Sequence, residues 1–167
     1  MPKEEKYSVL LDTSFLLRLL SREDQLYNNA DAYFRLFLEN GITMKVSTVA
    51  IGEFCVHNSL NEFPLRNVQI LPYNFPHAVI AGRFAHILYE LRARGEIEAS
   101  PRAIIPNDVK QLAQAQFESD IRYFVTADSS SFKKYTQHIS KEEELTYEHL
   151  DIREVDYTNF FATLDLQ

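Results

Sequence analysis

Four acidic residues border or interrupt apolar segments, and together their side chains could do metal chemistry. Asp12 directly follows "YSVLL", and Asp128 comes two residues after "YFVT". Asp108 stands near the start of a helix-like segment, and Glu53 interrupts the apolar segment "VAIGEFCV". Carboxylate oxygens are the ligands that hard divalent cations such as Mg²⁺ prefer. A cation held by few carboxylates keeps several waters, and it therefore has sites for a phosphate group and an attacking water.

Each of these acids also has a structural interpretation when it is taken alone. Asp12 and Asp128 have the position of helix N-caps, between a strand and a helix. Asp108 would stabilise the first turn of its helix through the helix dipole. The flanks of Glu53 indicate a helix buried on most sides, where a carboxylate needs a charge partner, hydrogen bonds or a cation. The joint pattern favours a cation site, because unpaired carboxylates gathered in one cleft repel each other strongly.

Strands alternating with helices are expected to position these acids. Short apolar runs predict strands over residues 7–11, 44–47, 68–71, 122–126 and 151–155. Apolar residues at helical spacing, together with breakers and caps, predict helices over 13–20, 24–39, 48–61, 77–94, 106–117, 129–135 and 157–164, with Thr48 as the cap of the third. This alternation is typical of a three-layer α/β/α fold with a parallel sheet of four to five strands.

The predicted fold places two acids where ligands bind. In an open parallel α/β sheet, ligands bind beyond the carboxyl ends of the strands, which is where Asp12 and Asp128 fall. The 167 residues show no repeat, low-complexity tract or flexible linker, so we expect a single domain over residues 1–167.

The charge balance limits how the chain could meet a polyanion. The net charge of −7 argues against nucleic-acid binding through bulk charge, although a local basic track is compatible with it. Basic residues near the acidic motifs, or in and after the long helix, are candidates for phosphate contacts or for solubilising surface charges: Arg18, Arg22, Arg83, Arg92, Arg94, Arg102, Lys133 and Lys134.

Several other classes of protein are disfavoured by the sequence. No apolar run is long enough for a membrane span, and the N-terminal residues lack the apolar core of a signal peptide. The single cysteine, Cys55, is typical of a reducing compartment, so we expect a cytoplasmic location. The histidines show no HxxxH pair that would indicate a zinc site. The sequence also lacks the hydrolase nucleophile turn and the glycine-rich phosphate loops.

Four segments resemble, in order, the motifs of the PIN-domain nucleases, and in particular those of the VapC-like toxin group. They are "LLDTSFLLRLL", "STVAIGEF", "IIPNDVKQLAQA" and "YFVTADSSSF", and the resemblance covers about residues 8–155. By this resemblance, Asp12, Glu53, Asp108 and Asp128 are the catalytic, metal-binding acids. The hydroxyls of Ser14 and Thr126 match supporting positions in the first and fourth motifs.

The resemblance implies an endoribonuclease that depends on Mg²⁺ or Mn²⁺ and whose metal activates water for attack on an RNA phosphodiester. It also implies an RNA substrate, an antitoxin protein partner and a homodimer. A toxin and a housekeeping RNA-processing nuclease fit the sequence alike. Two alternatives stay open: a non-catalytic PIN-like domain that binds RNA or protein, and a metal-dependent phosphohydrolase acting on a small nucleotide.

Overall fold

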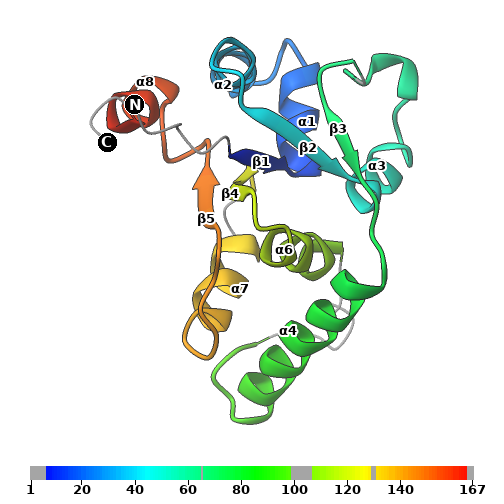
Figure 1. Cartoon of the computed structure of the whole chain (residues 1–167), viewed down its shortest axis with the longest axis vertical. Helices are drawn as coiled ribbons and strands as arrows, with labels where there is room; N and C mark the ends of the chain where they lie inside the picture. The colour runs from blue at the N-terminus through cyan, green and yellow to red at the C-terminus, as the bar shows by residue number, and fades with distance from the viewer. Residues whose placement is uncertain (1–6, 65, 99–106, 129–130, 165–167) are drawn as a thin grey trace.

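A sheet of five parallel strands forms the centre of the molecule (Figure 1). The computed structural model describes residues 7–64, 66–98, 107–128 and 131–164, and the following statements concern these ranges. The strand order across the sheet is β3-β2-β1-β4-β5. The bounds are β1 (Ser8–Leu11), β2 (Thr43–Ser47), β3 (Gln69–Leu71), β4 (Ile121–Thr126) and β5 (Glu148–Asp151).

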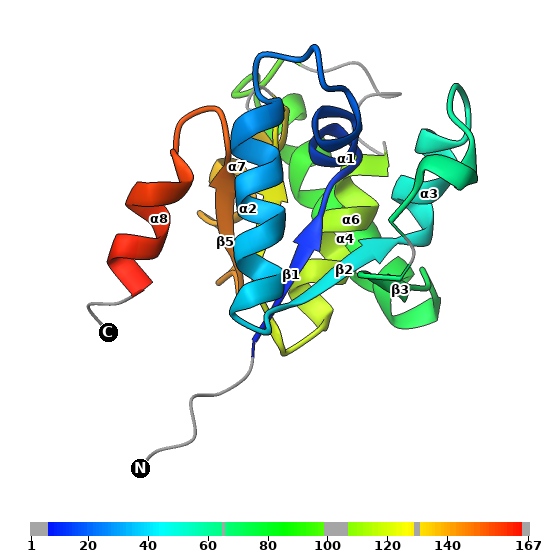
Figure 2. The same ribbon diagram turned by 90° about the horizontal axis from the view of Figure 1, so that it is seen from above.

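Helices cover both faces of the sheet, which confirms the predicted three-layer α/β/α fold. The bounds are α1 (Thr13–Leu20), α2 (Tyr27–Glu39), α3 (Thr48–Phe54), α4 (Phe75–Ala93), α6 (Asn107–Phe117), α7 (Ser131–Ile139) and α8 (Tyr157–Leu164), with a 3₁₀ turn, η1, at Leu60–Glu62. One face carries α1, α2 and α8, and the other carries α4, α6 and α7 (Figures 1 and 2). None of the helices in the described ranges combines the length and apolar character needed to cross a membrane.

The strands are apolar on successive positions because they face a hydrophobic core on each side. Val9 and Leu11 of β1 pack toward α1 and α2, whereas Leu10 packs toward α4 and α6. In β4, Val125 joins the first core and Phe124 joins the second. Successive side chains of a strand point to opposite faces, so a strand buried on both faces loses the alternation of polar and apolar residues.

The strand predicted over residues 151–155 is wrong in its position. β5 covers Glu148–Asp151, so Asp151 ends the strand instead of beginning it. The Asp151 Oδ1 atom accepts a hydrogen bond from the backbone N–H of Arg153 at 2.9 Å, and this local turn closes the strand. The apolar pattern was misleading because Ile152, after the strand, is also buried in the core.

The helix predicted over residues 48–61 ends early and has a different cap. α3 stops at Phe54, and η1 follows after a short turn. The N-cap is Ser47, whose Oγ accepts from the backbone N–H of Val49 at 2.9 Å. The hydroxyl of Thr48 instead accepts from the backbone N–H of Tyr73 at 3.0 Å, which ties the start of α3 to the segment after β3. In the helix predicted over 129–135, residues 129 and 130 lie outside the described residues, and α7 continues to Ile139.

Candidate active site

The topology brings the four acids to one edge of the sheet. All strands are parallel, so α1 and α3, which follow β1 and β2 directly, begin at the carboxyl edge. α6 precedes β4 and ends near the opposite edge, so its first turn, with Asp108, returns to the carboxyl edge. Asp12 and Asp128 follow β1 and β4 at that same edge, and Glu53 lies in the last turn of α3.

Asp12 is the most deeply buried of these acids, with 3% of its surface exposed. Its Oδ2 atom accepts hydrogen bonds from the Ser14 hydroxyl at 2.5 Å, the Ser14 backbone N–H at 3.2 Å and the Thr126 hydroxyl at 3.1 Å. Its Oδ1 atom accepts from the Gln111 amide at 3.3 Å. Burial raises the pKa of Asp12, and the bonds from Ser14 and Thr126 act in the opposite direction. Asp12 is therefore both the N-cap of α1 and the centre of a polar network.

Ser14 and Thr126 also fix the backbone that carries Asp128. Their hydroxyl oxygens lie 3.0 Å apart. The Ser14 Oγ atom accepts from the backbone N–H of Ala127 at 2.9 Å, and the Thr126 Oγ1 atom accepts from the backbone N–H of Asp128 at 3.0 Å. The two hydroxyls therefore hold the carboxyl end of β4 in register with the start of α1, so the positions of Asp12 and Asp128 depend on each other.

Glu53 is held between α1 and α6. One carboxylate oxygen, Oε2, accepts from the Thr13 hydroxyl at 2.7 Å, and the other accepts from the Asn107 amide at 2.7 Å. The expectation of a helix buried on most sides is wrong: α3 buries only Ala50 and Phe54, whereas Gly52 within it is exposed, as are Cys55 and Val56 directly after it. α3 is apolar but lies at the rim, so Glu53 is half-buried and points across the edge of the sheet instead of into the core.

The pKa of Asp108 indicates that the four acids share one electrostatic environment. Its pKa is raised to about 7, first by burial and then by the negative charges of Asp12, Glu53 and Asp128. Near neutral pH its carboxyl group is therefore partly protonated, which is unusual for an aspartate in the first turn of a helix. The like charges are close enough to disfavour ionisation of Asp108.

The donor set fits a hard divalent cation in its chemistry. The four side chains offer only carboxylate oxygens, and a cation among them would reverse the repulsion that raises the pKa of Asp108. In the described ranges, no three Asp, Glu, His or Cys side chains already stand at metal-ligand spacing. The four acids thus lie at the same edge of the sheet and influence one another electrostatically, but they do not form a closed coordination shell.

Three polar residues of the site were not singled out from the sequence: Thr13, Asn107 and Gln111. Thr13 directly follows Asp12, and Asn107 directly precedes Asp108, so their positions beside the acids could have identified them. Gln111 lies one helical turn after Asp108 and is fully buried, with its Oε1 atom unpaired among the described residues. A glutamine on the buried face of an apolar helix needs a polar partner, and here that partner is Asp12.

The fold and the site together define the class of protein: a parallel α/β/α domain with an acidic cluster at the carboxyl edge of its sheet. Three solved structures share the fold. The chain is 19% identical to a chain of VapBC2 from Rickettsia felis bound to a promoter DNA fragment, with a TM-score of 0.56 over 86% of this chain and 98% of that one. A chain of DNA-bound VapBC from Salmonella typhimurium is 16% identical, with a TM-score of 0.55 and the same coverage of both chains.

The third is VapC20 of Mycobacterium tuberculosis, a toxin that cleaves the sarcin–ricin loop. It is 17% identical, with a TM-score of 0.50 over 76% of this chain and 95% of that one. No model of a protein family matches the sequence, and no curated protein matches it significantly. The chain therefore has the PIN-like fold of the VapC toxins, and identities this low concern the fold alone.

Proposed function

We propose that this chain is an endoribonuclease that depends on Mg²⁺ or Mn²⁺, with Asp12, Glu53, Asp108 and Asp128 as the metal-binding and catalytic acids. The observation that supports the proposal is the gathering of the four acids at the carboxyl edge of the sheet, where burial and the three other acids raise the pKa of Asp108 to about 7. Asp12, Glu53 and Asp108 form no ion pair with a Lys or Arg among the described residues, although nine ion pairs occur elsewhere there. A cluster of this kind has little structural benefit without a cation.

A bound cation would supply a Lewis acid and would lower the pKa of a water molecule. The residues of the chain prepare this chemistry in distinct ways. Ser14 and Thr126 orient the Asp12 carboxylate, and the backbone that they hold positions Asp128. Thr13 and Asn107 orient Glu53 through both of its oxygens. Such hydrogen bonds to ligand carboxylates fix their direction and raise metal affinity.

The proposed substrate is RNA, and the proposed partner is an antitoxin protein. The support comes from the similar structures: two are VapBC complexes, and the third is a toxin that cleaves the sarcin–ricin loop. We further propose a single PIN-like domain over residues 1–167, a homodimer and a cytoplasmic location. A non-catalytic binding domain is the alternative, but such a domain has little physical reason to keep four carboxylates that repel one another.

The test is cleavage of mixed cellular RNA by wild type and by Asp12→Asn, with Mn²⁺ and with EDTA. Asn retains the ability to cap α1 but loses the charge. We expect EDTA to abolish cleavage, and Asp12→Asn to lower its rate at least about a hundredfold. Asp31→Asn is the matched control, since Asp31 is a surface acid on α2 that pairs with Arg35. Cleavage near the wild-type rate by folded Asp12→Asn would contradict the proposal.

A further inference from the structure

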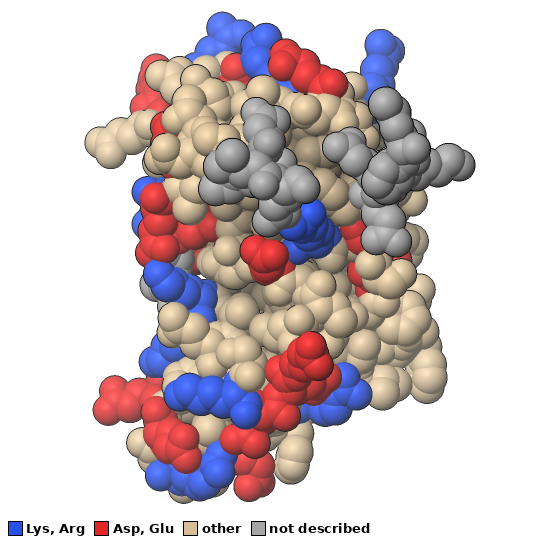
Figure 3. Space-filling view, turned by 60° about the vertical axis from the view of Figure 1, so that its left-hand side comes forward, with Lys and Arg blue, Asp and Glu red and all other residues tan. Residues whose placement is uncertain are grey.

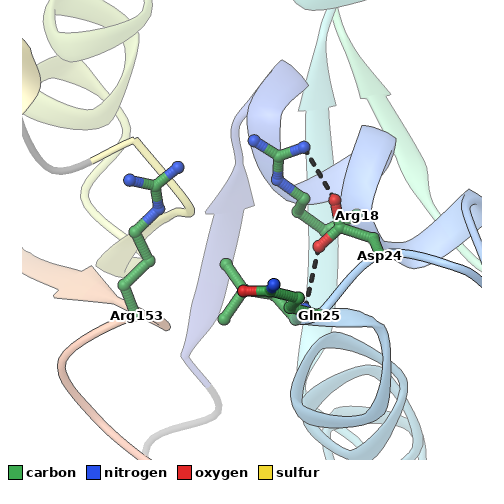
Figure 4. Close-up of a pocket in the computed structure, with 5 residues that line it drawn as sticks. Arg18, Asp24, Gln25 and Arg153 are labelled. Carbon is green, nitrogen blue, oxygen red and sulfur yellow. Dashed lines mark hydrogen bonds and ion pairs between the residues drawn. The ribbon is translucent and has the colours of Figure 1, made fainter.

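A cleft of about 390 Å³ opens between the α1–α2 connection and the segment after β5 (Figure 4). It is lined by Arg18, Asp24, Gln25, Leu26 and Arg153. None of these residues belongs to the acidic cluster. Figure 4 shows the guanidinium groups of Arg18 and Arg153 on either side of β1, both at the level of its arrowhead. The two arginines thus face one cleft from segments far apart in the sequence.

The cleft adjoins the carboxyl edge that carries the acids. Arg18 lies on α1, the helix that Asp12 caps. Arg153 directly follows Ile152, whose backbone N–H donates to the carbonyl of Thr126 at 3.0 Å. Thr126 in turn donates to Asp12. Arg18 and Arg153 therefore flank the strand ends from which Asp12 and Asp128 project.

The charges of the cleft are only partly compensated. Arg18 Nη1 contacts Asp24 Oδ2 at 2.9 Å, and Asp24 Oδ1 accepts from the backbone N–H of Leu26 at 2.8 Å, which fixes the aspartate. The Nε atom of Arg18 is buried and has no acceptor among the described residues. Arg153 is exposed, and its guanidinium group forms no ion pair or hydrogen bond with another described residue. One aspartate therefore faces two arginines, which leaves a net positive charge and unused donors.

Three of the other basic residues predicted to contact phosphate are already paired, whereas Arg22, Arg92 and Lys134 are exposed and form no ion pair among the described residues. Arg83 pairs with Glu143, Arg94 Nε contacts Glu96 at 3.1 Å, and Lys133 contacts Glu154 at 2.7 Å. Figure 3 shows basic and acidic side chains intermingled at the lower end of one face, over the end of α4 and the α7–β5 connection, instead of a continuous basic track. Arg102 lies outside the described residues. Arg18 and Arg153 differ from these residues because their two guanidinium groups line one cleft beside the carboxyl edge.

We propose that Arg18 and Arg153 together bind a backbone phosphate of the RNA, next to the phosphate that is cleaved. The inference rests on the proposed function, which it deepens by assigning the path of the RNA across the carboxyl edge. Two guanidinium forks facing one cleft suit a group with several acceptor oxygens, and arginine forks match phosphate geometry. A partner protein's carboxylate suits the cleft less well, because Asp24 already supplies one there. A phosphate held here fixes the register of the RNA without reading its sequence.

The experiment measures binding without cleavage, so that it does not depend on the chemistry. A fluorescently labelled single-stranded RNA oligonucleotide is titrated with protein in EDTA at several salt concentrations, and anisotropy reports the affinity. The variants are Arg153→Gln, Arg18→Gln, Arg18→Lys and the double Arg18→Gln/Arg153→Gln. Arg35→Gln is the matched control, because Arg35 pairs with Asp31 on α2 much as Arg18 pairs with Asp24.

We expect the double variant to bind the RNA roughly tenfold more weakly than Arg35→Gln, which is the effect of losing charge-assisted hydrogen bonds. The slope of log affinity against log salt should flatten by about 0.7 for one lost phosphate contact. Arg18→Lys should bind more weakly than wild type, because lysine keeps the charge but not the fork. Arg153→Gln tests the same site at an exposed residue, so its result stands even if the Arg18 variants misfold.

Equal affinity and slope in the double variant and in Arg35→Gln would overturn the inference. So would unchanged RNA binding together with weaker binding of a polyglutamate peptide, which would assign the cleft to an acidic protein segment. The cleavage assay separates this inference from the proposed function. A wild type that binds RNA through the two arginines but does not cleave it with Mn²⁺ would refute the nuclease while supporting the phosphate site.

Discussion

Ser14 donates its hydroxyl hydrogen to Asp12 Oδ2 at 2.5 Å, and the same hydroxyl oxygen accepts from the backbone N–H of Ala127 at 2.9 Å. One small side chain thus joins the start of α1 to the carboxyl end of β4, more than a hundred residues away. The bond to Asp12 keeps a buried carboxylate satisfied, and the bond from Ala127 fixes the backbone before Asp128. Folding and the geometry of the candidate site depend on the same contact.

Replacement of Ser14 by Ala should therefore lower both stability and activity. The change leaves a buried backbone N–H and a carboxylate oxygen each without one partner, which costs about 1–3 kcal/mol. Urea unfolding followed by circular dichroism measures the loss. Ser21→Ala is the control, because Ser21 is exposed at the end of the same helix. An unfolding free energy of Ser14→Ala equal to that of the control would show that this contact has no net effect.

The sequence predicted the parts of the site that depend on local pattern. β1 and β4 end close to the ends of their apolar runs, so the edge positions of Asp12 and Asp128 followed from these runs and from the expected parallel sheet. The end of β5 did not follow, because the turn that stops it is made by the side chain of Asp151 and not by a change in hydrophobicity.

Contacts between distant segments were outside the reach of the sequence. Gln111 bonds Asp12 across 99 residues, and Asn107 bonds Glu53 across 54. Arg153 faces Arg18 only because β5 lies two strands from β1 in the sheet. Parallel sheets are assembled from crossover connections, so partners on neighbouring strands are set by topology and not by spacing in the chain. The acids and the supporting hydroxyls of Ser14 and Thr126 had motif positions and were found from the sequence. Three further residues that support the acids had none and were not found: Thr13, Asn107 and Gln111.

Removal of the Asp108 charge should make the metal-free protein more stable, because it relieves the repulsion from the other acids. Asp108→Asn abolishes a carboxyl group that burial and three other acids disfavour as an anion. In EDTA its melting temperature should exceed that of wild type. Mn²⁺ at a hundred times its Kd should stabilise wild type by about 2.7 kcal/mol, a gain of several degrees, and the variant by less. Thermal melts of both proteins with and without Mn²⁺ decide this, and identical melting temperatures in all four would mean that the acids do not share a cation site.

The raised pKa of Asp108 also predicts how the stability of the metal-free protein depends on pH. The pKa of Asp108 is about 7 in the folded protein and 3.8 in its unperturbed state, so the folded state binds this proton more tightly. Its contribution is favourable at low pH and is lost progressively as the pH rises from about 4 to about 7. Unfolding free energies in EDTA across this range should fall more steeply for wild type than for Asp108→Asn. Asp31→Asn should keep the wild-type slope, and a variant slope equal to that of wild type would contradict the assignment.

Removal of the Asn107 side chain should weaken metal binding, because Asn107 helps to orient the Glu53 carboxylate. Asn107 donates to Glu53 Oε1 at 2.7 Å while Thr13 donates to Oε2 at 2.7 Å, so the carboxylate is held at both ends. Asn107→Ala removes one of these donors without changing any charge. Loss of a hydrogen bond to a ligand carboxylate typically lowers metal affinity about 10–100-fold, and we expect a loss in this range for Mn²⁺ by isothermal titration calorimetry.

The pH dependence of the same titration separates orientation from charge. Because a cation must displace the proton that Asp108 carries below about pH 7, Mn²⁺ should bind more tightly to wild type as the pH rises through that value. Asn107→Ala should keep this pH dependence at a lower affinity throughout, whereas Asp108→Asn should lose it. Asn159→Ala, an exposed change on α8, should match wild type in both respects. If Asn107→Ala binds Mn²⁺ as tightly as Asn159→Ala does, Glu53 is either not a ligand or does not need this hydrogen bond to become one.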